Sequence, residues 1–218
     1  GRVQGMRRND DARRLPDVWT ARVTWQGVSG VKTMDDYAEW LLAGADVTSI
    51  EETVELEDEE FVATRERARS IDGGVAVVIH NDEGELLLVE NDWSDGYLPP
   101  GGGVEPGEDP EAAAVREAHE ETGVLVELER PVRVERRQYV REDADRDRDE
   151  DDVNSFRGGY DVTYLAHPIG EKTLADDPGR DDETIEDVAW FEDVPERTPV
   201  PNLLETVFES VSDAETDQ

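Results

Sequence analysis

The chain has 218 residues and is strongly acidic, with 57 Asp plus Glu against 22 Lys plus Arg, a net charge of -35, and no cysteine. A field of that sign repels phosphate backbones and anionic lipid, so we expect no nucleic-acid and no membrane partner. The longest apolar runs, at 75–79 and 86–89, are also far too short to span a bilayer. Without cysteine the chain has no disulfides, no thiolate metal ligands and no cysteine nucleophile, which agrees with a cytoplasmic protein.

Residues 1–70 predict an N-terminal extension that is partly helical. Thr33 is a suitable N-cap for a helix that ends near Gly44, and a second helix is predicted at 58–70, after an acidic stretch that begins at 51. The apolar positions of the first helix include Met34, Tyr37, Ala38 and Leu41. No chemistry is recognisable in this segment. We expect it to pack on the main domain or to aid assembly, which leaves a homodimer open, and to be dispensable for activity.

Residues 71–211 show strand patterns around one central helix. The predicted strands are 75–80, 86–89, 124–128, 132–140, 160–166 and 188–191, and a turn at 81–84 joins the first two. The central helix spans about 110–122, and a last amphipathic helix follows Pro201. The charged run 142–152 is expected to form a solvated hairpin loop, and 212–218 an acidic C-terminal tail. Strands on both sides of a helix, with more helix at both ends, predict an α/β fold with a mixed sheet covered by helices.

The central helix has well-marked ends and three convergent carboxylates. Asp109 suits the N-cap, Pro110 the first helical position and Gly123 a left-handed C-cap. The carboxylates are those of Glu117, Glu120 and Glu121, which stand at i, i+3 and i+4 and therefore share one face. The residues expected on the opposite, core-facing side are Ala112, Val115 and Ala118.

Like charges at this spacing repel one another, so a cation is expected between the three glutamates. Mg²⁺ is usually held by carboxylates, water and substrate phosphate oxygens, and Mn²⁺ is the alternative. The glycine run 101–103, just before the helix, lets backbone groups approach a ligand closely and complete a phosphate or metal shell. The alternative interpretation is a solvated acidic face in an acidic protein.

The complete arrangement resembles the Nudix box, whose pattern is Gly, five residues, Glu, seven residues, Arg-Glu, an apolar residue, any residue, Glu-Glu, any residue, Gly and an apolar residue. The residues that fill its defined places are Gly102, Glu108, Arg116, Glu117, Ala118, Glu120, Glu121, Gly123 and Val124. The resemblance implies a Nudix-type α/β/α sandwich over about 73–208. It also implies a Mg²⁺-dependent diphosphatase acting on a nucleotide-like small molecule, of the ADP-ribose, nucleoside triphosphate or dinucleoside polyphosphate type.

The same resemblance assigns roles to single residues. It makes Glu117, Glu120 and Glu121 metal ligands together with the Gly101 carbonyl, and Arg116 the residue that orients a carboxylate. Glu108 is left between an outer contact of the metal site and a cap of the helix. For the general base the family uses either a box glutamate or a glutamate in a later loop. The candidates in that loop are Asp181, Asp182, Glu183 and Glu186, of which Glu183 is preferred.

Four other residues are given structural interpretations. His119 lies away from the carboxylate face and is expected to be structural. Trp93 and Tyr97 are expected to be packed loop aromatics rather than stacking partners of a base. Tyr139 falls where some dinucleoside polyphosphate hydrolases of the family carry a tyrosine, and a strand tyrosine is common in any case.

Two other classes of protein share parts of this pattern, and the composition also indicates the kind of cell in which the protein works. A noncatalytic Nudix-like nucleotide-binding module would commonly lack box glutamates, and an isopentenyl diphosphate isomerase would need a cysteine that this chain lacks. Only Lys32 and Lys172 are lysines, and the acidic residues are spread throughout the chain. This pattern resembles proteins of halophilic cells, in which concentrated salt screens surface carboxylates.

Overall fold

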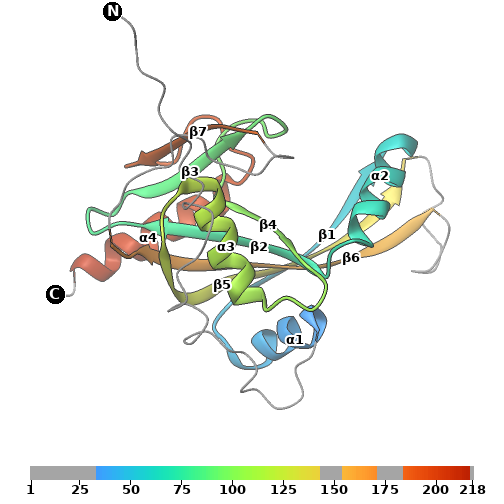
Figure 1. Cartoon of the computed structure of the whole chain (residues 1–218), viewed down its shortest axis with the longest axis horizontal. Helices are drawn as coiled ribbons and strands as arrows, with labels where there is room; N and C mark the ends of the chain where they lie inside the picture. Colours follow the sequence, from blue (N-terminus) through green and yellow to red (C-terminus); the bar gives the residue numbers. More distant parts are fainter. Residues whose placement is uncertain (1–32, 143–153, 171–183, 217–218) are drawn as a thin grey trace, which may run out of the picture.

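The structure, a computed structural model, describes residues 33–142, 154–170 and 184–216. They form a seven-stranded mixed sheet in the order β1-β5-β6-β2-β3-β7, with β4 paired to β2 (Figure 1). The strands are β1 Thr48–Leu56, β2 Gly73–His80, β3 Leu86–Asn91, β4 Gly101–Val104, β5 Val126–Arg141, β6 Ser155–Pro168 and β7 Ile185–Phe191. The helices are α1 Met34–Gly44, α2 Asp58–Ala68, α3 Pro110–Thr122 and α4 Pro201–Thr216. The predicted α/β class with a mixed sheet is confirmed.

Helices cover both faces of the sheet because the buried strands place apolar side chains on both. In β2, Val77 and Ile79 belong to a core that includes residues of α1 and α3, whereas Val78 belongs to a second core with Leu204 and Val207 of α4. This alternation follows from the two-residue repeat of a strand. Figure 1 shows α1 and α3 on one side of the sheet and α4 on the other, which makes the molecule an α/β/α sandwich.

The predicted α1 is confirmed together with its cap. The Thr33 side chain accepts a hydrogen bond from the backbone N–H of Asp36, and the Asp36 carboxylate accepts one from the N–H of Thr33. Its buried residues are those of the predicted apolar side, namely Met34, Tyr37, Ala38 and Leu41. Since they belong to the same core as α3, α1 is packed directly into the body of the domain.

The acidic stretch after α1 contains the edge strand β1, which the sequence did not predict. It runs parallel to β5, and the paired residues extend from Thr48 with Arg133 to Leu56 with Arg141. The second predicted helix is confirmed as α2, whose Phe61 is fully buried and packs edge-on against Phe156 of β6 with ring centroids 5.2 Å apart. Residues 33–70 therefore share the sheet and the core with the rest of the described chain.

The strand predictions for residues 124–140 differ from the structure in one respect. One strand, β5, spans both predicted stretches, and Pro131 is accommodated where the register with β6 shifts between Pro131 and Arg133. The predicted hairpin is confirmed by antiparallel pairing up to Val140 with Ser155, while most of its loop, 143–152, lies outside the described residues. None of the described helices has the length and apolar character needed to cross a membrane.

Candidate active site

The helix α3 begins and ends where the sequence predicts. The Asp109 carboxylate accepts hydrogen bonds from the backbone N–H groups of Glu111 (2.9 Å) and Ala112 (3.2 Å), and Gly123 ends the helix in the left-handed conformation with φ 76°. Val115 and Ala118 are buried as expected, but the prediction for Ala112 is wrong because it is exposed. The side that faces the core is centred near Ala114 and Ala118, and Ala112 lies almost opposite Ala114 at 100° per residue.

This orientation explains why two of the three glutamates are buried. Glu117 and Glu121 border the core-facing side, and they are 4% and 2% exposed. Glu120 lies farther round the helix, and its side chain is 25% exposed. The structure thus confirms that the carboxylates share one side of α3, with a gradient from buried to partly exposed.

Arg116 joins the carboxylates to the preceding loop. Its Nε and one terminal nitrogen donate to the two oxygens of Glu108, both at 2.9 Å, and the same terminal nitrogen donates to the Gly103 carbonyl at 3.1 Å. The other terminal nitrogen donates to Glu117 at 2.7 Å and to Glu120 at 3.1 Å. Glu108 is therefore a bidentate partner of Arg116 rather than a helix cap, a contact that spans eight residues and that helical spacing alone could not reveal.

The glycine strand β4 lies against these carboxylates because it has no side chains. The N–H of Gly101 donates to Glu121 at 2.9 Å. A Cβ at Gly102 would lie 2.5 Å from the nearer carboxylate oxygen of Glu117, and one at Gly101 would lie 2.2 Å from the Val75 carbonyl oxygen. Any other residue at Gly101 or Gly102 would force backbone or carboxylate to move, so the glycines are required by close packing.

The electrostatics of this region are set by several carboxylates that gather around the guanidinium of Arg116. Burial alone would lower the pKa of the Arg116 guanidinium, but its hydrogen bonds and charge interactions with Glu108 and Glu117 outweigh burial and raise that pKa. Arg116 therefore stays charged at any working pH. In the first turn of α3, burial raises the pKa of Glu111, whose carboxylate accepts a hydrogen bond from Tyr37 of α1 at 2.9 Å.

The donor set fits a hard divalent cation, since oxygen ligands are those that Mg²⁺ and Mn²⁺ prefer. Within the described ranges no group of three or more His, Asp or Glu side chains is already arranged to hold a metal ion. The hydrogen bonds account for this, because Glu117 and Glu120 turn toward Arg116 and Glu121 turns toward the N–H of Gly101. All three remain within one helical turn beside the backbone of β4.

The remaining candidate residues have different outcomes. Asp181, Asp182 and Glu183 lie outside the described residues, and Glu186 is exposed on β7. His119 is partly buried in the last turn of α3. Tyr139 is half-buried and stacks on Phe156 with ring centroids 4.9 Å apart, which is a packing role.

The two loop aromatics behave differently from each other. Tyr97 packs edge-on against Phe191 and donates a hydrogen bond to Asp187, so its predicted packing role is confirmed. That hydrogen bond, together with burial, raises the pKa of Tyr97 to about 12. Trp93 is 61% exposed, so its predicted packed position is wrong.

A mixed sheet between helices, with an acidic helix braced against a glycine strand, defines a class of α/β domain suited to binding a cation and phosphate oxygens together. The chain belongs to the NUDIX family, whose domain matches residues 71–196. The match includes the glycine strand, α3 and β7 and begins after α1, β1 and α2.

Curated relatives share a short segment with this chain. Diphosphoinositol polyphosphate phosphohydrolase 3-alpha of Mus musculus is 51% identical over 49 residues, which is 22% of this chain and 30% of that protein. Diphosphoinositol polyphosphate phosphohydrolase 2 of Homo sapiens is also 51% identical over 49 residues, 27% of its length. The chain thus aligns with less than a third of the length of these relatives.

Solved structures of the family resemble the fold over a larger part of the chain. A NUDIX hydrolase from Nitrosomonas europaea is 22% identical, covering 63% of this chain and 88% of that chain with a TM-score of 0.42. An Ap4A hydrolase of C. elegans is 16% identical, covering 66% of this chain and 99% of that chain with a TM-score of 0.44.

Proposed function

We propose that the protein is a Mg²⁺-dependent Nudix-type diphosphatase that hydrolyses the diphosphate linkage of a nucleoside diphosphate joined to another group. The observation that carries the proposal is the contact between α3 and β4. It places two buried glutamates and one partly exposed glutamate beside the backbone of three consecutive glycines. A solvated acidic face would not bury Glu117 and Glu121, nor would it be braced by a guanidinium with bonds to three carboxylates.

The proposal assigns each residue of the site a role in the hydrolysis. Glu117, Glu120 and Glu121 would hold the ion together with the Gly101 carbonyl, and Arg116 orients Glu117 and Glu120 through its hydrogen bonds. When bound, Mg²⁺ neutralises phosphate charge and lowers the pKa of the attacking water. Glu183 takes the proton of that water as its oxygen attacks phosphorus, the bridging P–O bond breaks, and the leaving phosphate departs with the electron pair.

The chemistry of the site suggests the substrate class, and the relatives help to choose the substrates to test. A diphosphate suits a site that combines a divalent ion with carboxylate ligands and a closely approaching glycine backbone, as between α3 and β4. The named relatives act on diphosphoinositol polyphosphates, and the similar structures include an Ap4A hydrolase and an ADP-ribose pyrophosphatase. Nucleotidic diphosphates of the ADP-ribose, nucleoside triphosphate and dinucleoside polyphosphate types therefore make up the first panel of substrates, with a diphosphoinositol polyphosphate beside them.

The proposal includes the setting in which the enzyme works. Its net charge of -35 and its two lysines among 218 residues suit the concentrated salt of a halophilic cytoplasm. Assays are therefore designed at molar potassium chloride as well as in dilute buffer.

The test compares Glu120→Gln and Glu121→Gln with the wild type on this panel. Each change preserves shape and removes one charge, so turnover should fall by about 100-fold or more, as expected for a lost metal ligand. Magnesium should also raise the melting temperature of the wild type and do so less in both variants, because a ligand of the folded state stabilises it by mass action. Glu183→Gln should lower turnover and leave the magnesium response of the melting temperature intact.

The matched control is Glu205→Gln, which neutralises an exposed glutamate of α4 and should change neither turnover nor magnesium response. Glu111 is unsuitable as a control because it is bonded to Tyr37. Wild-type rates for both Glu120→Gln and Glu121→Gln at saturating magnesium would refute catalysis by this helix and favour the noncatalytic binding module.

A further inference from the structure

A tyrosine of the N-terminal helix α1 is hydrogen-bonded to α3, the helix that carries the three glutamates. The Tyr37 hydroxyl donates to the Glu111 carboxylate in the first turn of α3, at 2.9 Å. The same hydroxyl accepts a hydrogen bond from the Tyr164 hydroxyl of β6 at 3.1 Å. Both tyrosines are only 1% exposed. Tyr37 therefore links the sheet to the first turn of α3 from inside the core.

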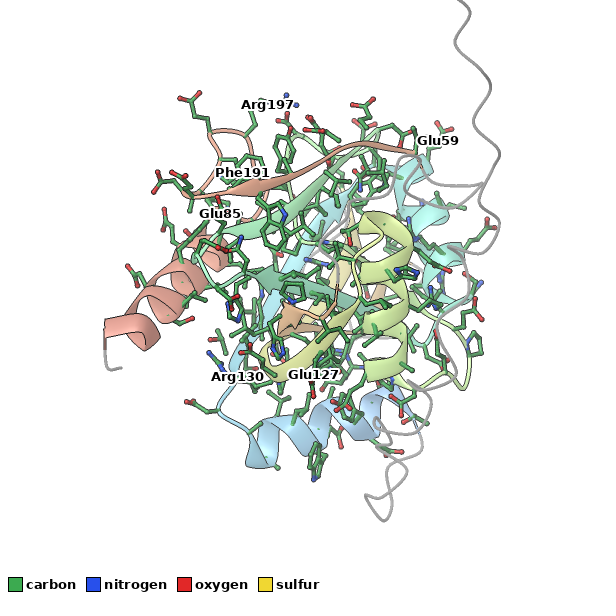
Figure 2. The ribbon with its side chains drawn as sticks, turned by 60° about the vertical axis from the view of Figure 1, so that its left-hand side comes forward. Glu59, Glu85, Glu127, Arg130, Phe191 and Arg197 are labelled. Carbon is green, nitrogen blue, oxygen red and sulfur yellow. The ribbon has the colours of Figure 1, made fainter. Side chains whose placement is uncertain are left out.

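The two helices meet with one end of α3 directed at α1. Figure 2 shows this end of α3 pointing toward α1, and Figure 1 shows the same arrangement from another side. The bond to Glu111 identifies the end as the first turn. Glu117 and Glu121 lie about 9–15 Å farther along the helix, at a rise of 1.5 Å per residue. Tyr37 can therefore influence them only through the position of the helix.

The apolar packing of α3 leaves its exact position to directional contacts. The buried side chains that it places in the core shared with α1 are small, namely Ala113, Ala114, Val115 and Ala118. Apolar contact is non-directional, whereas a hydrogen bond has a preferred distance and angle. Near the far end of the helix, Glu121 accepts a hydrogen bond from the N–H of Gly101 at 2.9 Å. The bond between Tyr37 and Glu111 is the corresponding attachment at the first turn.

Burial keeps both tyrosines protonated, because it raises the pKa of Tyr37 and of Tyr164. Burial also raises the pKa of Glu111, and the hydrogen bond from Tyr37 acts against that rise because it stabilises the charged carboxylate. Loss of the Tyr37 hydroxyl would leave the partly buried Glu111 without this donor. The carboxylate can relieve that cost by moving toward water together with the first turn of α3.

We propose that Tyr37 is a positioning residue for the metal site, because its bond to Glu111 sets how α3 lies against β4. The inference rests on the proposed function, which places the ion between these two elements. α1 precedes residues 71–196, which match the family. The chain thus supplies, from outside the matched domain, a contact on which the alignment of Glu117 and Glu121 beside Gly101 depends.

The experiment compares Tyr37→Phe with Tyr164→Phe, since each change removes one buried hydroxyl and keeps the ring. Tyr37→Phe removes the bond to α3, whereas Tyr164→Phe leaves that bond in place and is the matched control. On the best substrate of the panel, Tyr37→Phe should lower kcat about tenfold and raise the magnesium concentration that gives half the maximal rate, because a small misplacement far from the reacting atoms slows turnover. Tyr164→Phe should keep both quantities within about threefold of the wild type.

A double-mutant cycle tests whether Tyr37 acts through Glu111. Glu111→Ala should lower kcat about as much as Tyr37→Phe does, and the double variant should lose no more than either single variant. Glu111→Gln keeps an acceptor for the Tyr37 hydroxyl and should retain most of the turnover. Losses of kcat that multiply in the double variant would overturn the inference.

The magnesium response of the melting temperature separates failure of this inference from failure of the proposed function. Magnesium should raise the melting temperature less in Tyr37→Phe than in Tyr164→Phe. Equal kcat and equal magnesium response in these two variants would overturn the positioning role, even if Tyr37→Phe melts at a lower temperature. A wild type without magnesium-dependent turnover, together with a weaker magnesium response in Tyr37→Phe, would overturn the proposed function and support the positioning role. A wild type with neither turnover nor magnesium response would overturn both.

Discussion

Two regions of this molecule bury carboxylates, and they balance charge in different ways. Beside β4, Glu117 and Glu121 are almost fully buried, and Arg116 is the one guanidinium bonded among Glu108, Glu117 and Glu120 in the described residues. Among the described residues, three carboxylates there share one guanidinium. Stability alone does not favour such an arrangement, because unbalanced buried charge is costly unless a cation arrives.

The second region is a cluster of charged side chains on β5 and β6. It consists of Arg133, Glu135 and Arg137 of β5 and Asp161 of β6. Its buried carboxylate, Glu135, is 4% exposed and is paired with both Arg133 and Arg137. Arg137 also pairs with Asp161 at 3.1 Å. Burial raises the pKa of Asp161 although both arginines act to lower it. Both acids here, the buried Glu135 and the partly exposed Asp161, have a protein cation, which is typical of a structural network.

The difference teaches that the balance of charge, rather than burial, separates a site from a scaffold. A buried acid that the protein itself neutralises holds strands together. A group of acids that shares one guanidinium folds and gains stability when an ion binds, as expected where function is placed above stability.

The largest effect is expected when the N-terminal part is removed. A chain that begins at Ser70 loses nine β1 residues paired with β5 and the four buried residues of α1. Each large apolar side chain contributes about 1.5–3 kcal/mol, so their sum approaches the ~5–15 kcal/mol that stabilises a domain. From this packing we now predict the opposite of the expectation from sequence that this part is dispensable. We expect no cooperative thermal transition by circular dichroism, and a folded, active truncation would show that the network of β5 does not need β1.

The second prediction compares the loss of one arginine from each region. Arg116→Gln should lower turnover by about 100-fold or more, because Glu117 and Glu120 lose the group that orients them. Arg137→Gln should leave turnover per folded molecule within about threefold and lower the melting temperature. Steady-state kinetics beside thermal melts give both readouts. Equal losses of turnover in the two variants would remove the distinction between the regions.

The third prediction concerns the buried acid of the sheet. Glu135→Gln leaves two guanidinium groups beside a neutral amide, which should cost about 3 kcal/mol in the free energy of unfolding. For a chain of this size that corresponds to a fall of roughly 6–12 °C in melting temperature. Magnesium should raise the melting temperature of this variant by as much as it raises that of the wild type. A lost magnesium response would mean that the two regions are coupled.

The smallest effect expected is that of salt on the whole surface. With a net charge of -35, repulsion between surface carboxylates at low ionic strength should lower the stability of the fold. Molar potassium chloride should raise the melting temperature by several degrees, because it shortens the Debye length to about 3 Å and so screens this repulsion. The ion pairs of Glu135 with Arg133 and Arg137 should be weakened less by salt than exposed pairs, because they are partly buried. A melting temperature equal in dilute buffer and in molar salt would remove the halophilic interpretation.

The sequence predicted those elements whose signals are local. The Thr33 cap with the apolar side of α1, and the Asp109, Pro110 and Gly123 signals of α3, lie within a few residues of the structure they determine. The box on α3 likewise identified the carboxylates through their spacing. Helical geometry also placed them on one side, and the structure confirms it.

Features that depend on distant partners were missed. From the sequence β1 looks like an acidic stretch, because its parallel partner β5 lies 85 residues further along the chain. The bonds of Arg116 to Glu108 cross from helix to loop, and the loop that carries the exposed Trp93 is held by the distant Arg197. Tertiary contacts decide such features, so local patterns could not predict them.

The order of the sheet also bears on how copies of this protein meet. Both outermost strands, β1 and β7, have one edge without a partner strand among the described residues, a form that invites another strand to pair. The exposed side chains there include Glu51, Glu52 and Glu55 on β1 and Glu186 and Asp187 on β7. Edge-to-edge pairing would bring these carboxylates together from two molecules. Repulsion between these carboxylates should therefore prevent the two edge strands from pairing with other molecules. This protection against aggregation is strongest at low salt, where the charges are least screened.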